Sequence, residues 1–306
     1  MTMEESGTQA PARGYTLHGQ RLHAPALQPG LHVVSTPIGN LADVTLRALT
    51  TLAAADIVVC EDTRVTSRLT GHYGITARFF AYNDHNAPRM RPQILGRLQS
   101  GQAVALVSDA GTPMISDPGY KLVREAIEAG VAVYSAPGAS AALAALAVAG
   151  LPTDRFFFEG FLPAKEGARA ARLAEIKPIP ATLVFYESGP RLAESLAAMA
   201  RALGDRPASV ARELTKAYET VYRGTLASLA ADFAAAEPRG EIVIVVGPPV
   251  EEPVSASEME ALLAEALERL SVKDAAASVA ARLGLPRRDV YARAIELASS
   301  RRDTPA

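Results

Sequence analysis

The chain has 306 residues, 49% of them hydrophobic, and a formal net charge of −2 at pH 7. This length allows two core-bearing domains with a small appendage, and the charge excludes a general attraction to nucleic acid or anionic membranes. A single cysteine, Cys60, excludes an intramolecular disulfide and a cysteine zinc cluster. Neither a signal peptide nor a bilayer-spanning apolar stretch is recognisable. We therefore expect a soluble, cytoplasmic protein without a metal.

Residues 1–29 mix Gly, Pro, Gln, His and Arg without apolar periodicity, which predicts a disordered tail. A first domain over 30–149 then alternates predicted strands and helices. The predicted strands cover 31–35, 56–60, 78–81, 103–107 and 131–135, and the helices cover 44–55, 64–73, 91–99, 118–129 and 140–149. Such alternation with short connections indicates a mostly parallel, doubly wound α/β sheet. Asp43 and Asp117 are predicted to be helix N-caps.

A second α/β domain is predicted over 150–249. Its strands are expected at 156–158, 182–186, 208–212 and 241–247, with helices between them. The β-branched run 242–246 is typical of a strand covered on both faces. A Pro- and Glu-rich linker then leads into a small helical domain within 250–306. Predicted helices at 259–270, 272–283 and 289–298, with a Gly-Leu-Pro turn at 284–286, resemble a helix-turn-helix.

Three loops of the first domain follow apolar strands and carry Pro and Gly, at 36–40, 109–113 and 137–140. In an open α/β sheet the ligand lies beyond the carboxyl ends of the strands, where small loops bring backbone groups close to it. We expect the chemistry at these loops. The sequence lacks the motifs of dinucleotide oxidoreductases, P-loop NTPases, zinc proteases and α/β-hydrolases, which argues against those classes.

Six blocks occur in order: STPIGNLAD at 35–43, CEDTR at 60–64, VSDAGTP at 107–113, APGASA at 136–141, FYES at 185–188 and ARELTK at 211–216. Together they resemble the bacterial 16S ribosomal RNA (cytidine-2'-O)-methyltransferase family, a branch of the tetrapyrrole methylase fold. The resemblance implies two α/β domains with S-adenosylmethionine in the cleft between them, and a homodimer that methylates a cytidine ribose in the small ribosomal subunit. Two alternatives stay open: a methyltransferase of tetrapyrrole precursors on the same fold, and a non-enzymatic nucleic-acid-binding module.

The cofactor needs apolar walls, a few polar anchors and backbone donors. Gly111 allows close approach of the backbone, and Asp109 is either a partner for an ammonium or hydroxyl group or a turn residue. A helix that begins at Ser140 can donate to a carboxylate. The resemblance implies that Tyr186 and Leu214 line the adenine pocket, although core packing would also explain them. The predicted cofactor-binding residues are Pro37, Gly39, Asp109, Ala110, Gly111, Thr112, Pro113, Ser140, Ala141, Tyr186 and Leu214.

A ribose hydroxyl is a poor nucleophile until its proton is taken, so a carboxylate, His or Lys is expected beside it. The predicted catalytic residues are Glu61, Asp62, Arg64 and Lys216, while Asp84, His85, Glu187 and Glu213 remain alternatives for the base. Arg64 and Arg68, one helical turn apart, are expected to meet phosphate. Arginines of the C-terminal segment are predicted either to dock on RNA or to form a solvated face, at positions 282, 287, 288, 293, 301 and 302.

Overall fold

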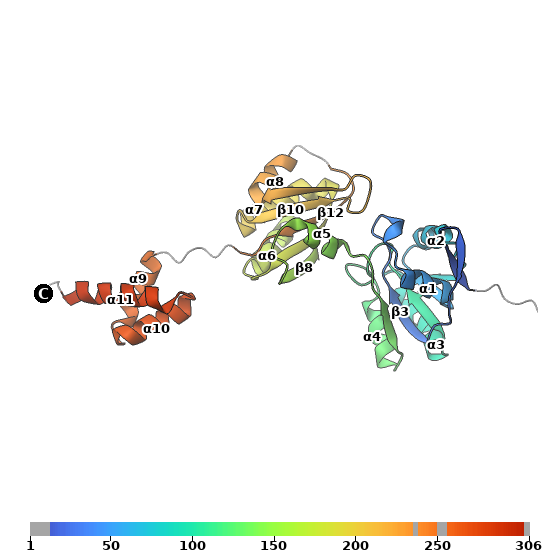
Figure 1. The fold of residues 1–306 in the computed structure, drawn as a ribbon, viewed down its shortest axis with the longest axis horizontal. Helices are drawn as coiled ribbons and strands as arrows, with labels where there is room; N and C mark the ends of the chain where they lie inside the picture. Colours follow the sequence, from blue (N-terminus) through green and yellow to red (C-terminus); the bar gives the residue numbers. More distant parts are fainter. Residues whose placement is uncertain (1–12, 235–237, 250–255, 303–306) are drawn as a thin grey trace, which may run out of the picture. The chain divides into compact units, whose positions relative to one another are not determined.

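The computed structural model describes residues 13–234, 238–249 and 256–302. The chain divides into two compact units, Met1–Pro249 and Val250–Ala306. A two-stranded hairpin and two five-stranded sheets belong to the first unit, and the second unit is helical (Figure 1).

The first sheet is parallel throughout, with the strand order β5-β4-β6-β3-β7. Its strands are β3 (Gly30–Val34), β4 (Ile57–Cys60), β5 (Phe79–Ala81), β6 (Ala103–Leu106) and β7 (Val133–Ala136). Helices α1 (Leu46–Ala54) and α2 (Thr63–His72) pack on one face, and α3 (Ala87–Gln99) and α4 (Tyr120–Glu128) pack on the other. This arrangement confirms the predicted doubly wound sheet, because apolar strands need helices on both faces.

The prediction of a disordered tail over 1–29 is wrong for its second half. Strands β1 (Gly14–Leu17) and β2 (Gln20–His23) form an antiparallel hairpin. Tyr15 is buried in the core beneath α1, and the Thr16 N–H donates to the Tyr73 carbonyl at 2.7 Å. Two strands of four residues carry too few apolar positions for a periodicity to stand out. Residues 1–12 lie outside the described residues.

Two predicted helix caps are also wrong. Helix α1 begins after Thr45, whose hydroxyl accepts a hydrogen bond from the Ala48 N–H at 3.1 Å, while Asp43 lies in the short 3-10 helix η1 (Leu41–Asp43). Helix α4 begins after Gly119, which adopts φ +140°, so Asp117 does not cap it. Asp62 caps α2 and accepts from the Arg64 N–H at 2.8 Å.

The second sheet has the order β11-β10-β12-β9-β8, and only β8 and β9 run parallel. Its strands are β8 (Phe156–Phe161), β9 (Thr182–Ser188), β10 (Pro207–Arg212), β11 (Thr220–Thr225) and β12 (Glu241–Val246). Helices α6 (Glu166–Ile176), α7 (Leu192–Leu203) and α8 (Leu226–Phe233) cover one face, and the short 3-10 helix η2 (Gly189–Arg191) precedes α7. Strand β12 is central and buried on both faces, as predicted.

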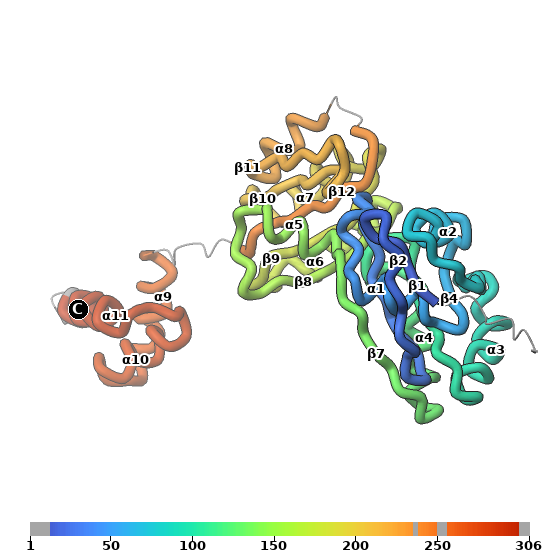
Figure 2. The backbone as a smooth tube through the Cα atoms, turned by 45° about the vertical axis from the view of Figure 1, so that its right-hand side comes forward, coloured from blue at the N-terminus to red at the C-terminus, as the bar shows by residue number. Residues whose placement is uncertain are grey.

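Helix α5 (Ala141–Ala149) covers the other face of the second sheet, where it packs against β9, β10 and β12 (Figure 2). The predicted domain boundary at 149/150 had placed this helix with the first sheet. Its nine residues are all Ala, Leu or Val, so the sequence shows no preferred apolar face that would indicate its partner. The crossing from one sheet to the other therefore lies before α5, between Ala136 and Ala141.

The second unit contains α9 (Ala256–Ala266), α10 (Val272–Leu283) and α11 (Arg287–Arg302), packed around Leu263, Val279 and Val290. Ser271 caps α10, and Gly284, with φ +65°, ends it. The predicted turn at 284–286 thus separates α10 from α11. No helix in the described ranges is both long enough and apolar enough to span a membrane.

Candidate functional site

The loops that follow β3, β6 and β7 are tied to one another by hydrogen bonds. Thr36 and Gly111 exchange backbone hydrogen bonds of 2.8 and 3.1 Å. The Ser35 and Thr112 hydroxyls lie 2.9 Å apart, and the Thr112 hydroxyl donates to the Ala139 carbonyl at 3.2 Å. Because β6, β3 and β7 are neighbours, these bonds build one frame at the carboxyl end of the first sheet, as the sequence predicted.

A first cavity of about 200 Å³ lies between this frame and the second sheet. Its lining is Ile38, Ala110, Gly111, Thr112, Ile115, Ser116, Asp117, Ser140, Ala141, Phe161, Tyr186, Glu187, Ala211, Leu214, Glu241, Ile242 and Val243. Seven of these residues are among the predicted cofactor-binding residues. Gly111 adopts φ +74°, and a Cβ there would lie 3.3 Å from Ile38 Cγ2, so a larger residue would be strained at this wall.

Four titratable side chains line the first cavity, namely Asp117, Tyr186, Glu187 and Glu241. Burial raises the pKa of the Asp117 carboxyl, against a hydrogen bond from the Ser108 hydroxyl, and the charge of Asp109 raises it further. Burial also raises the pKa of the Tyr186 phenol, although the Ala142 N–H donates to it. The Tyr186 ring packs edge-on against Phe158 at 4.9 Å between centroids. Asp117 and Tyr186 thus add a carboxyl and a phenol to the first cavity, whose lining also contains Glu187 and Glu241.

A second cavity of about 420 Å³ adjoins the first and shares Ile38, Ala110 and Glu241 with it. Its lining is Thr36, Pro37, Ile38, Gly39, Leu41, Val65, Thr66, Arg68, Leu69, Ser108, Asp109, Ala110, Lys216 and Glu241. Pro37, Gly39 and Asp109, which were predicted to bind the cofactor, lie here and do not line the first cavity. Pro113 is buried and lines neither of these two cavities.

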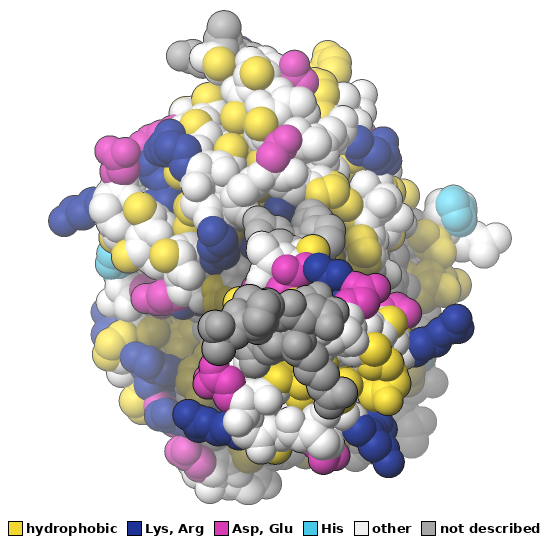
Figure 3. All heavy atoms as spheres, turned by 90° about the vertical axis from the view of Figure 1, so that its left-hand side faces the viewer, with side chains coloured by type: hydrophobic (Ala, Val, Ile, Leu, Met, Phe, Trp, Pro, Cys, Tyr) yellow, Lys and Arg dark blue, Asp and Glu magenta, His cyan; other side chains and the backbone are white. Residues whose placement is uncertain are grey.

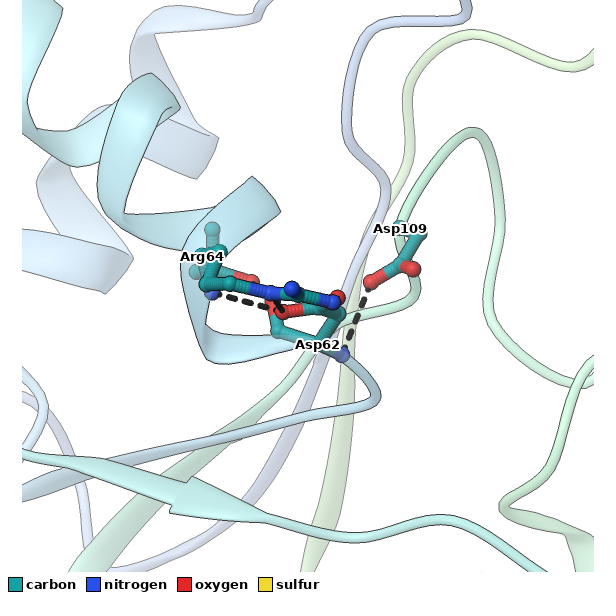
Figure 4. A network of polar contacts seen from close by, with 4 residues as sticks. Asp62, Arg64 and Asp109 are labelled. Atoms are coloured by element: carbon teal, nitrogen blue, oxygen red, sulfur yellow. Dashed lines mark hydrogen bonds and ion pairs between the residues drawn. The ribbon is translucent and has the colours of Figure 1, made fainter.

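Asp62, Arg64 and Asp109 form a chain of hydrogen bonds between the start of α2 and the loop after β6 (Figure 4). The Asp109 carboxylate accepts from the Asp62 N–H at 2.9 Å. Asp62 in turn accepts from Arg64 Nε at 3.0 Å and from Nη2 at 2.5 Å. The hydrogen bonds from Arg64 lower the pKa of Asp62 to about 2. Near neutral pH the Asp62 carboxylate is therefore ionised and hydrogen-bonded to Arg64.

Glu61 and Lys216, two further predicted catalytic residues, differ in their surroundings. Burial raises the pKa of Glu61, and four neighbouring carboxylates raise it further, but its side chain lines neither cavity. The Lys216 ammonium donates to Glu213 at 2.8 Å and to Glu241 at 2.9 Å. Burial lowers the pKa of Lys216, but these bonds outweigh burial and the net shift is upward. Lys216 therefore stays protonated near neutral pH and does not act as a base there.

Sequence reasoning predicted Tyr186 of the second sheet but missed other strand residues in the lining of the first cavity, among them Ala211, Ile242 and Val243. Ala211 begins the block at 211–216 without a chemical feature of its own, and no motif marks which residues of β12 face the α5 side. Asp117 was interpreted as a helix cap, although it stands only four residues beyond the predicted block at 107–113. Within the described ranges, no three His, Cys, Asp or Glu side chains are grouped so that they could hold a metal ion.

Comparison with known proteins identifies the family. Residues 30–230 match the family Tetrapyrrole (Corrin/Porphyrin) Methylases, and residues 253–298 match the RsmI C-terminal HTH domain. The Ribosomal RNA small subunit methyltransferase I of Mesorhizobium japonicum is 52% identical over 89% of this chain and 93% of its own length. The protein of the same name in Escherichia coli O157:H7 is 46% identical over 88% and 96%. The chain belongs to the ribosomal RNA small subunit methyltransferase I family.

Solved structures agree with this membership at the level of fold. A cobalt precorrin-4 methyltransferase has a TM-score of 0.54 at 19% identity and covers 71% of this chain and 94% of its own. The Thermus thermophilus uroporphyrin-III C-methyl transferase, solved with S-adenyl homocysteine, has a TM-score of 0.51 at 22% identity, covering 71% and 97%. This member of the ribosomal RNA small subunit methyltransferase I family therefore has the tetrapyrrole methylase fold that the six sequence blocks implied.

Proposed function

We propose that this protein transfers a methyl group from S-adenosylmethionine to the ribose 2'-hydroxyl of a cytidine in the 16S RNA of the small ribosomal subunit. The names of relatives about half identical to the chain support the RNA substrate. The observation that carries the cofactor assignment is the first cavity, where residues from five of the six sequence blocks and from both sheets meet. The same resemblance supports action in the cytoplasm as a homodimer.

The first cavity fits the chemistry of this cofactor. S-adenosylmethionine, when bound, supplies a methyl group on a positively charged sulfur. Ile38, Leu214 and Val243 offer the apolar wall that an adenosine needs, and Asp117 offers a negative charge for the cationic groups. Ser140 gives no side-chain cap to the first turn of α5, so that turn can donate N–H groups to a carboxylate beside it. These groups would hold the cofactor and align its methyl group with the acceptor, and methyl transfer requires mainly such alignment from a protein.

RNA binding must come from local groups of basic side chains, because the protein carries no net positive charge. In Figure 3 the Lys and Arg side chains are interspersed with Asp and Glu. In the second unit, Lys273, Arg287, Arg288 and Tyr291 line a cavity of about 360 Å³. We propose that these four residues contact RNA phosphate. Arg293, a predicted RNA contact, is instead paired with Glu260 and Glu296, and the side chains of Arg301 and Arg302 lie outside the described residues.

A labelled-methyl assay tests the function. The purified protein is incubated with tritiated S-adenosylmethionine and, in separate reactions, small subunits from a strain lacking this methylation, free 16S RNA and uroporphyrinogen III. We expect label in the subunits, released by digestion as 2'-O-methylcytidine. Label on uroporphyrinogen alone would support the tetrapyrrole alternative, and cofactor binding without any transfer to RNA would refute the proposal.

A further inference from the structure

We infer that the second cavity binds the target nucleoside, turned out of the RNA, next to the methyl donor. The inference deepens the proposed function and rests on it. The two cavities share Ile38, Ala110 and Glu241 in their linings, so they are neighbours in the structure. Methyl transfer requires the donor and the acceptor to lie side by side.

The apolar lining comes from two sides of the cavity. Pro37 and Leu41 belong to the segment after β3, whereas Val65 and Leu69 belong to α2. Leu41 and Val65 are 38% and 37% exposed, so this apolar lining is open to a ligand. Enzymes that act on an extruded base hold it between aromatic or apolar side chains. These four side chains, the apolar slot, can contact the pyrimidine ring of the target nucleoside in the same way.

The polar lining suits the rest of a nucleotide. Asp109 has one carboxylate oxygen fixed by the Asp62 N–H at 2.9 Å, and this bond holds the carboxylate at the second cavity, where it can accept a hydrogen bond from a ribose hydroxyl. Arg68 has no ion-pair partner among the residues that the structure describes, and it lines the same cavity from α2. Its guanidinium is available for the phosphate of the same nucleotide. One cavity thus combines the apolar slot, a carboxylate that can accept a hydrogen bond from a hydroxyl group, and a guanidinium that can bind phosphate.

Filling the slot tests the inference. Val65→Trp places a large ring where the pyrimidine is expected, on a side chain that already tolerates solvent. Ile127→Trp is the matched control, because Ile127 is 60% exposed on α4 and lines neither cavity. For both variants, kcat and KM with methylation-deficient small subunits are measured beside the affinity for S-adenosylmethionine from calorimetry.

We expect Val65→Trp to lower kcat/KM at least about tenfold, equivalent to about 1.4 kcal/mol of lost binding, while its cofactor affinity stays within about twofold of wild type. The control should match wild type in both measurements. Arg68→Ala should raise KM with little change in kcat, since a phosphate contact acts mainly in binding. Unchanged kcat/KM in Val65→Trp would overturn the inference and leave the proposed function intact. A wild-type enzyme that binds cofactor but modifies no RNA would overturn both.

Discussion

Gly39→Ala should destabilise the first unit by about 2–4 kcal/mol, because Gly39 meets the side chain of Lys216 across the site. Its φ of +155° is strained for any other residue, and such strain costs about 1–3 kcal/mol. An added Cβ would also lie 2.5 Å from Lys216 Cγ. Carbon contacts need about 3.5 Å, so the lysine must move by about 1 Å. That movement disturbs its bonds to Glu213 and Glu241, which are partly exposed and worth up to about 1 kcal/mol.

Urea unfolding followed by far-UV circular dichroism measures this cost. Gly101→Ala is the matched control, since Gly101 also has a positive φ, +84°, but nothing lies within 4 Å of its added Cβ. It should show the backbone strain without the collision. In a double-mutant cycle, Lys216→Ala should recover about 1 kcal/mol of the Gly39→Ala cost by removing the colliding stem. Equal losses in the two glycine variants, with no coupling to Lys216, would refute the reasoning.

Four further outcomes follow from the site and its surroundings. Asp117→Asn should weaken the binding of S-adenosylmethionine by about tenfold, because in the proposed site the carboxylate faces the sulfonium. It should weaken the binding of S-adenosylhomocysteine less, because the sulfur of that thioether is neutral. Equal losses of affinity for the two ligands by calorimetry would place Asp117 away from the sulfur. Burial raises the pKa of the Cys60 thiol from 9.0 to about 11, which lowers the thiolate fraction at pH 8 about a hundredfold. Iodoacetamide should therefore alkylate Cys60 quickly only in urea, and rapid labelling of the native protein would contradict this. The hydrogen bond from Lys216 lowers the pKa of Glu213, so its contribution to stability is present above its unfolded value of 4.5 and is lost as the pH falls through the lower folded value. Glu213→Gln should flatten that acid limb of the unfolding free energy, and an unchanged limb would speak against the shift. Replacing both Arg287 and Arg288 by Ala should reduce the log–log salt slope of small-subunit binding by about 1.4–1.8, since each phosphate contact contributes about 0.7–0.9; an unchanged slope would mean that they do not touch phosphate.

The first sheet could be predicted because its strands are short, largely apolar runs that alternate with helical segments, and three of them, β3, β6 and β7, lead into loops with Pro and Gly. The same reasoning failed where a strand is exposed or carries few apolar residues. Strand β11 has no fully buried residue, and it escaped the analysis for that reason. The hairpin of β1 and β2 escaped because its two strands carry only three apolar side chains, Tyr15, Leu17 and Leu22, among polar ones. The packing of α5 on the second sheet could not be inferred either, because a helix that is apolar on every side does not indicate which element it contacts.

In the candidate site too, some features could be predicted from the sequence and others could not. Ala110, Gly111 and Thr112 were predicted because their loop carries its own motif, and they do line the first cavity. Asp109 stands in the same motif but lines the second cavity, because its carboxylate bonds the Asp62 N–H on the α2 side. Neighbouring residues in a loop thus belong to two different cavities. Only the three-dimensional arrangement separates them, because adjacent residues of one loop point to different sides of it.

A crystal structure of the protein with S-adenosylhomocysteine tests the central claim most directly, because that claim concerns where the methyl donor lies. The account predicts the ligand in the first cavity, with Tyr186 and Leu214 beside the adenosine and the sulfur close to the wall of Ile38 and Ala110 that leads into the second cavity. A ligand found in the second cavity, or outside both, would contradict the assignment of donor and acceptor.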